Sequence, residues 1–174
     1  MAIPLTSIGV WVGYGYQAEE TATPPTTDLT FTHIPMIKEI PDLDSAPDTI
    51  ETTSLDNMEY KTYVSGLKDL GGALAFTAGL SNDLLVLWND TICGQWEGIK
   101  ESNKGALWLC VDIPGLTKSV YFKFEPSKIG LTGVGVNEAI DVDLHITPLS
   151  EPIWAADIAD ESKQEPSAAM NYEY

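Results

Sequence analysis

Apolar and polar residues alternate one by one through several separate segments of this chain, and this alternation limits the possible folds most. A period of two places successive side chains on opposite faces of an extended strand. The pattern is clearest in GALAFTAGL (72–80), SVYFKFEP (119–126) and GVGVNEAIDVDLHIT (133–147). In the last of these, a bulge is expected near Asn137-Glu138, because Glu138 falls in the apolar phase. We therefore expect a fold built mainly of half-buried strands.

Four further segments are predicted to be strands, from alternation, from β-branched content or from a turn sequence between them. They are LTFTHIPMI (29–37), EYKTYVSGL (59–67), QWEGIKE (95–101) and ALWLCVDIP (106–114). The turn sequence SNKG separates the last two, so Trp96 and Trp108 are expected on opposed strands.

One segment has helical spacing instead. Ser81 or Asn82 is suited to cap a helix, and Asp83 is favourable in its first turn. Apolar residues then recur at helical intervals, and Gly94 stands where a C-terminal cap is expected. These apolar residues are Leu84, Leu85, Trp88 and Ile92. We predict one helix over residues 82–92, with Trp88 in the core.

These elements predict an antiparallel β-sandwich or half-barrel with one flanking helix. A length of 174 residues suits one domain with tails. We assign residues 1–28 to an N-terminal arm, 29–149 to the β-domain, and 150–174 to a C-terminal arm. The final residues form a polar, acidic tail, expected to be mobile alone, and Ile153 and Trp154 before it are expected to dock on the domain.

Residues 38–58 are the longest stretch without a core pattern. They include Pro41 and Pro47, and from Asp42 to Asp56 there are acids but no base. A loop of this length within a compact domain is usually functional or disordered. Its Thr and Ile residues indicate that part of it becomes extended when it meets a partner. We interpret this segment as an assembly loop.

The charge of the chain excludes several kinds of partner. Nine Lys+Arg stand against 26 Asp+Glu, a formal net charge of −17, and none of the nine bases is an arginine. A protein that binds nucleic acid or an anionic membrane surface needs clustered positive charge on its own surface. The first residues lack the basic region of a secretory signal, and no apolar run is long enough to span a membrane. We expect no membrane association and two unpaired cysteines, Cys93 and Cys110.

No motif in the sequence predicts catalysis, a metal site or a cofactor site. The histidines are His33 and His145, and neither cysteine has the spacing of a zinc or hydrolase signature. His145 alternates with Asp141 and Asp143, which we interpret as a polar row on a strand. The five tryptophans leave a second reading open, in which the chain is a carbohydrate-binding or adhesin-like β-sandwich module. A hydrolase with two acidic residues is supported only by composition.

The segment from Ile40 to Leu80 resembles the major tail tube proteins of long, flexible-tailed bacteriophages. In that family, a proline- and acid-bearing stretch precedes a strand, a Gly-Leu-x-Asp-x-Gly-Gly turn and another strand. The first stretch is matched here by Pro47, Ile50, Thr53, Leu55 and Asp56. The turn is matched by Gly66, Leu67, Asp69, Gly71 and Gly72. The order of the helix and later strands is similar as well.

This resemblance implies a non-enzymatic virion protein, assembled in the bacterial host cytoplasm. Six copies would form a ring, and rings would stack into a hollow tube through which the genome passes on ejection. The implied partners are further copies of the chain, the tape-measure protein, the tail terminator and the distal tail or baseplate proteins. Double-stranded DNA would pass without specific binding, and the two terminal arms would join rings.

Two sets of residues are assigned roles in this tube. The assembly loop would reach a neighbouring subunit or ring. We place its contacts at Asp42, Asp44, Pro47, Asp48, Ile50, Thr53, Leu55 and Asp56. The polar row of Asp141, Asp143 and His145 faces away from the apolar side of its strand and is expected to line the channel. An acidic bore without arginine would let phosphates slide.

Overall fold

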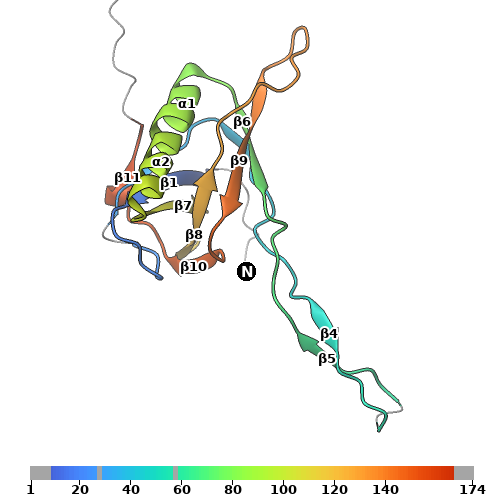
Figure 1. Ribbon diagram of the computed structural model, residues 1–174. Coiled ribbons are helices and arrows are strands. Elements are labelled where there is room, and N and C mark those ends of the chain that lie inside the picture. Colours follow the sequence, from blue (N-terminus) through green and yellow to red (C-terminus); the bar gives the residue numbers. More distant parts are fainter. Residues whose placement is uncertain (1–8, 27–28, 57–58, 167–174) are drawn as a thin grey trace, which may run out of the picture.

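The computed structural model describes residues 9–26, 29–56 and 59–166, and Figure 1 shows how their elements are arranged. Eleven strands are present in this part of the chain. They are β1 (Trp11–Gln17), β2 (Phe31–His33), β3 (Ile37–Glu39), β4 (Thr49–Glu51), β5 (Tyr63–Ser65), β6 (Leu74–Gly79), β7 (Ala106–Asp112), β8 (Lys118–Pro126), β9 (Asp141–Pro148), β10 (Ile153–Ala156) and β11 (Lys163–Gln164). One continuous helix comprises α1 (Asn82–Leu85), a π-helical segment (Val86–Ile92) and α2 (Cys93–Ser102). A short 3₁₀ turn, Asp160–Ser162, precedes β11.

Nine strands form one curled sheet, in which eight follow the order β11-β2-β1-β7-β8-β9-β6-β3 and β10 pairs with β8 beside this path. All neighbours in this order are antiparallel except β11 and β2. The first part of β8 pairs with β7 and β10, whereas its last residues, from Phe124, pair with β9. The sheet therefore turns along β8, and the predicted mainly-β half-barrel with one helix is confirmed.

The main core lies between the helix and the inner face of this sheet. Alternate residues of β6, β7, β8 and β9 point inward, as their sequence pattern predicts. Trp88 from the helix is 1% exposed, and its ring stacks on Phe124 with 6.4 Å between ring centroids. The outer face of β7 is buried as well, because Trp108 and Cys110 pack in a second cluster with Phe31, Tyr121 and Ile158. This double burial explains why ALWLCVD is almost continuously apolar.

The helix is longer than predicted, and the strand predicted over 95–101 is wrong. Ser81 caps the N-terminus as expected, because its side chain accepts a hydrogen bond from the Leu84 amide at 3.1 Å. Gly94 lies inside the helix, which ends only at Asn103, in a left-handed conformation with φ 53°. The π-helical segment changes the spacing of apolar residues, so the continuation to Ser102 is obscured in the sequence. Trp96 is therefore helical and does not oppose Trp108 on a strand.

The long strand predicted over 133–147 is correct only in its second part. β9 begins at Asp141, and residues 127–140 form a projecting loop between β8 and β9. Its partner strand β6 ends at the pair Gly79–Asp141, so the preceding residues have no strand to pair with. Asn137 adopts φ 61°, and the expected bulge is a turn instead.

Two other predicted strands are also shorter than expected. Residues 29–37 form two strands, β2 and β3, because the chain turns at Met36 with φ 65°. In the 59–67 segment only Tyr63–Ser65 is a strand, and it pairs with β4.

Parts of both expected arms belong to the sheet. β1 lies between β2 and β7, at the centre of one half of the sheet. At the other terminus, β10 pairs with β8 and β11 pairs with β2. The acidic tail expected to be mobile is thus bound to the sheet up to Gln164. Residues 1–8, 27–28 and 167–174 of the two arms, and 57–58 of the assembly loop, lie outside the described residues.

Candidate assembly surfaces

An arm projects from one end of the body (Figure 1). We define the arm as residues 46–67, which contain the hairpin of β4 and β5. Ile50 pairs with Val64 across the two strands, and Thr52 donates its amide hydrogen to the Thr62 carbonyl at 2.8 Å. Towards the body, the Asp48 amide donates to the Leu67 carbonyl at 3.0 Å. The predicted loop is therefore extended already in the single chain.

The residues predicted for the assembly loop are distributed along this arm. Asp42 and Asp44 lie at its base, where the Asp44 amide donates to the Asp42 carboxylate at 2.9 Å. The others follow the outward limb to the region of the tip: Pro47, Asp48, Ile50, Thr53, Leu55 and Asp56. Every residue from 49 to 65 that the structure describes is exposed, and Leu55 is 98% exposed. Exposed apolar side chains are thus gathered on a hairpin that projects from the body.

The family turn motif returns the chain from the arm to β6. Gly66, Leu67 and Asp69 lie on the inward limb, and the Asp69 carboxylate accepts a hydrogen bond from the Gly71 amide at 2.8 Å. Gly71 and Gly72 have φ values of 87° and 84°. Side chains rarely adopt this left-handed conformation, which accounts for the two glycines.

Asp141, Asp143 and His145 share the outer face of β9, as predicted from the alternation. The intervening residues, Val142 and Leu144, are buried in the main core. Asp141 forms an ion pair with Lys38 at 2.6 Å, and the Thr77 hydroxyl donates to Asp143 at 3.4 Å. The three predicted residues thus lie in one polar row on the half of the sheet formed by β8, β9, β6 and β3.

A C-terminal strap, residues 153–166, crosses the other half of the sheet. The Lys163 ammonium lies 2.6 Å from the Asp112 carboxylate, which is 7% exposed as a residue, and 5.5 Å from the centre of the Trp11 ring. Ser119 donates a hydrogen bond to Asp112 at 3.1 Å and is also bonded to Asp157 at 2.5 Å. This cluster was not predicted from the sequence. The sequence feature that could have indicated it is Asp112, a single charged residue at the end of a strand that is otherwise apolar.

The strap shifts the pKa values of two of its charged groups. Burial lowers the pKa of Lys163, but the hydrogen bond and charge of Asp112 outweigh this effect, so the pKa is raised. Burial likewise raises the pKa of Asp157, but hydrogen bonds from the Ser119 side chain and the Ile158 amide outweigh it and lower the pKa. Both groups therefore stay charged near neutral pH.

Replacing Lys163 with Met is expected to destabilise the chain by about 1–3 kcal/mol, because it leaves the Asp112 carboxylate buried without its cation. Urea unfolding measures the change in the free energy of unfolding, and hydrogen exchange of residues 157–166 reports release of the strap. Lys118→Met, at an exposed lysine, is the control and should change stability by less than about 0.5 kcal/mol. Equal stability of the two variants would show that the ion pair does not hold the strap.

The described residues hold no metal-binding cluster and no exposed thiol. They contain no group of three or more His, Cys, Asp or Glu side chains placed to hold a metal ion. Both cysteines are buried and unpaired, and burial raises the pKa of Cys110 to about 12, so its thiol is protonated at neutral pH. Among the helices of the described residues, none combines the length and apolar character needed to cross a bilayer.

The sheet has three strand edges that no other described strand covers, and the outer edge of the two-residue strand β11 is one of them. β3 ends the order of the sheet, and β10 pairs only with β8. Ile153 and Trp154 dock on the domain through the pairing of β10 with β8, as predicted, but the Trp154 side chain remains 54% exposed. At the remaining end, β11 covers β2. Open edges present unpaired amide and carbonyl groups to a second chain.

No protein family model matches the sequence, and no curated protein matches it. Solved structures do match. A chain in the cryo-EM structure of the anti-feeding prophage (AFP) baseplate, 6-fold symmetrised, is 11% identical with a TM-score of 0.58, covering 90% of this chain and 98% of that one. A chain in the extended sheath-tube complex of an extracellular contractile injection system, PVC, is 13% identical with a TM-score of 0.56, covering 88% and 93%.

A chain of the SPP1 tail tube also matches, at 12% identity and a TM-score of 0.43, covering 90% of this chain and 81% of that one. The two matches with TM-scores above 0.5 are only 11% and 13% identical to this chain, so they establish its fold and nothing further. The fold implied by the sequence resemblance is thereby confirmed: this chain folds like a chain of a prophage baseplate and a chain of a contractile sheath-tube complex.

Proposed function

We propose that this chain is a structural, non-enzymatic subunit of a bacteriophage tail tube. The observation that carries the proposal is an exposed, partly apolar arm on a sheet whose β3 and β10 edges are open. The fold likeness to chains of a baseplate and a sheath-tube complex supports the same role. Six copies form a ring, as the 6-fold symmetrised baseplate suggests, and rings stack into the tube of the virion.

The half of the sheet with β8, β9, β6 and β3 is suited to line such a ring. Four strands from each of six copies give 24 strands. With about 4.8 Å between strands and a tilt of about 40°, the circumference is roughly 150 Å and the backbone diameter roughly 48 Å. A bore of this size, narrowed by side chains, still admits double-stranded DNA.

In this arrangement Asp141, Asp143 and His145 face the bore. Lys38 neutralises Asp141 within its own chain, so Asp143 carries the less compensated charge of the row. With a formal charge of −17 on each chain, the wall repels phosphates over roughly 8 Å at physiological salt. DNA would therefore pass without specific binding during ejection.

The remaining partners follow from this role. The arm reaches a neighbouring subunit or ring through Ile50, Leu55 and the other residues named above. The ends of the tube meet the tail terminator and the distal tail or baseplate proteins, and the bore holds the tape-measure protein before ejection. Assembly takes place in the host cytoplasm. The strap holds residues up to Gln164 on their own sheet, which leaves the residues beyond it to join rings.

The alternative, a carbohydrate-binding module, has weaker support. Sugar-binding sites need aromatic rings that are open to solvent, but Trp88 and Trp108 are each only 1% exposed. Trp11 is covered on one side by Lys163 and stacks on His33. Trp154 alone among the tryptophans is more than half exposed, and it lies on an open strand edge.

Electron microscopy of the purified full-length chain at high concentration tests the proposal. We expect rings and hollow tubes, and a reconstruction in which Asp143 points into the bore. A chain that remains monomeric at all concentrations would overturn the proposal. Tubes with Asp141 and Asp143 both outside the bore would overturn only the assignment of the channel face. Glycan binding by a monomer would favour the alternative.

A further inference from the structure

The loop between β8 and β9, residues 127–140, is held firmly at its base. The Trp88 indole N–H donates to the Ser127 carbonyl at 2.7 Å, and the Ile129 amide donates to the Asn89 side chain at 2.8 Å. Both tethers come from consecutive residues of the π-helical segment. Further along, the Thr132 hydroxyl donates to the Asp141 carbonyl at 2.7 Å. The loop therefore starts from a fixed position on the body.

The loop projects at the end of the molecule opposite the arm (Figure 1). Beyond its base, its apolar side chains are exposed. Val136 is 90% exposed and Leu131 is 76% exposed, and Val134 is also exposed. Apolar groups gathered on a projecting loop are unusual for a protein that stays alone in water. The alternation of residues 133–147 predicted that these valines lie on the core face of a strand, so their exposure is a finding of the structure.

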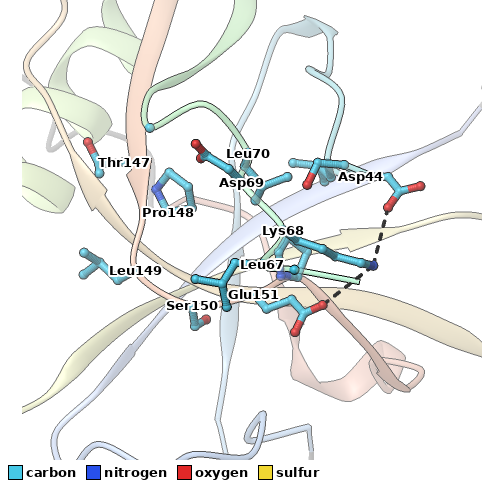
Figure 2. A pocket seen from close by; sticks show the side chains of 15 residues that line it. Asp44, Leu67, Lys68, Asp69, Leu70, Thr147, Pro148, Leu149, Ser150 and Glu151 are labelled. Atoms are coloured by element: carbon cyan, nitrogen blue, oxygen red, sulfur yellow. Dashed lines mark ion pairs between the residues drawn. The ribbon is translucent and has the colours of Figure 1, made fainter. Parts of the chain in front are cut away.

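A recess lies at the base of the arm, with a volume of about 550 Å³. Its wall combines the two limbs at the arm base with the segment that follows β9, and its apolar lining includes Leu67, Leu70 and Leu149. Figure 2 shows Lys68 between the carboxylates of Asp44 and Glu151, at 3.9 and 4.0 Å. The hydroxyl oxygen of Ser45, which also lines the recess, is buried without a hydrogen-bond partner among the described residues.

The loop and the recess lie at opposite ends of the same pair of strands. Leu74 pairs with Ile146 near the recess, and Gly79 pairs with Asp141 near the loop. At about 3.3 Å per residue, these two pairs are about 17 Å apart. A projection at one end and a recess at the other allow identical copies to associate head to tail. A head-to-tail contact of this kind continues as an open stack when the rotation between successive copies does not close a ring.

We propose that the β8–β9 loop of one copy seats in the recess of the next copy along the tube. This contact rests on the proposed function and is separate from the arm. The exposed valines and leucine of the loop cover the apolar wall of the recess. The backbone of the loop, which contains Gly130, Gly133 and Gly135, offers the buried Ser45 hydroxyl a hydrogen-bond partner.

The charges of the two surfaces favour this pairing. Each chain carries −17, so most surfaces of two copies repel each other. The loop carries one lysine, Lys128, and one glutamate, Glu138, and thus has no net charge. It can approach the recess, with its acids and Lys68, without the repulsion that an acidic segment would meet.

Two substitutions test the contact from its two sides. Val136→Asp in the loop and Leu149→Asp in the recess should each reduce the sedimenting tube fraction about tenfold or more, while ring-sized particles persist. Leu85→Asp is the matched control, because Leu85 is an exposed leucine on α1 that belongs to neither surface. It should assemble like the wild type. Circular dichroism of each of the three variants measures whether it is folded.

Cross-linking provides a second, independent readout. A chain with both Val136→Cys and Leu149→Cys has a thiol at each end, so mild oxidation of tubes should give a ladder of three or more linked chains. The native Cys93 and Cys110 are buried and do not compete. Val136→Cys alone should give no species larger than a dimer.

The outcomes separate this inference from the proposed function. If the wild-type chain forms tubes and Val136→Asp forms them equally well, the loop contact is overturned and the tube proposal stands. Tubes of the double cysteine variant that give no ladder would do the same. A wild-type chain that never assembles would overturn both.

Discussion

Removal of the arm is expected to abolish assembly and leave a folded monomer. The change excises residues 49–65 and joins Asp48 to Gly66 through an Asn-Gly turn. These two residues are already neighbours, because the Gly66 amide donates to the Asp48 carbonyl. Asn-Gly is suited to a tight turn between antiparallel limbs. The excised residues that the structure describes are all exposed, so the core and the recess remain intact.

Stability and assembly are measured separately for this variant. Thermal unfolding by circular dichroism should change little, since none of the excised side chains that the structure describes is buried, whereas electron microscopy and sedimentation should show no rings or tubes. Loss of the folded state would show that the arm contributes to the core. Tubes of normal length would show that the arm is not an assembly surface.

Point variants test whether one face of the arm is responsible for assembly. Ile50 and Val64 lie opposite each other, and replacing both with Asp should prevent assembly. Thr49 and Ser65 form the adjacent cross-strand pair and face the other way, so replacing both with Asp adds the same charge as a control. If both double variants assemble poorly, added charge is the cause. If only the first does, the apolar pair makes the contact.

Replacing Trp88 with Ala is expected to destabilise the chain by about 3–5 kcal/mol, enough to unfold a subunit of marginal stability. Trp88 is 1% exposed, so the substitution leaves a large cavity between the helix and the sheet. It also removes stacking on Phe124 and the hydrogen bond to the Ser127 carbonyl. Urea unfolding measures the loss in the free energy of unfolding.

Two further variants separate the loss of stability caused by the buried Trp88 ring from the loss caused by its hydrogen bond. Trp154→Ala is the control, because Trp154 is 54% exposed on an edge strand, and its cost should be about 1 kcal/mol or less. Trp88→Phe keeps most of the ring but loses the indole N–H, so hydrogen exchange should increase at the base of the β8–β9 loop with a smaller loss of stability. An unchanged melting temperature for Trp88→Ala would contradict the burial of this side chain.

Several elements were predictable because their pattern repeats locally. Leu74, Phe76 and Ala78 alternate on β6, and Val120, Phe122 and Phe124 alternate on β8, and all six are buried as predicted. The helix start at Ser81 was predictable because capping depends on a few neighbouring residues. The polar row on β9 followed from the same period of two.

Other elements depended on partners distant in the sequence. Val134 and Val136 continue the alternation of β9, but their predicted strand does not form because β6 ends before it could pair with them. The helix continued past Gly94 because the π-helical segment shifts the apolar spacing, which a constant period of 3.6 does not detect. The strap was missed because Lys163 and Asp112 are 51 residues apart and neither belongs to a motif.

The sequence by itself determined the strand class, the buried faces, the start of the helix and an acidic segment without a core pattern, because each depends on the order of nearby side chains. The tertiary structure alone decided where strands end, which edges remain open, and how the loop and the recess come to lie at opposite ends of β6 and β9. These features depend on pairing between distant segments, and strand pairing stops where the neighbouring strand stops.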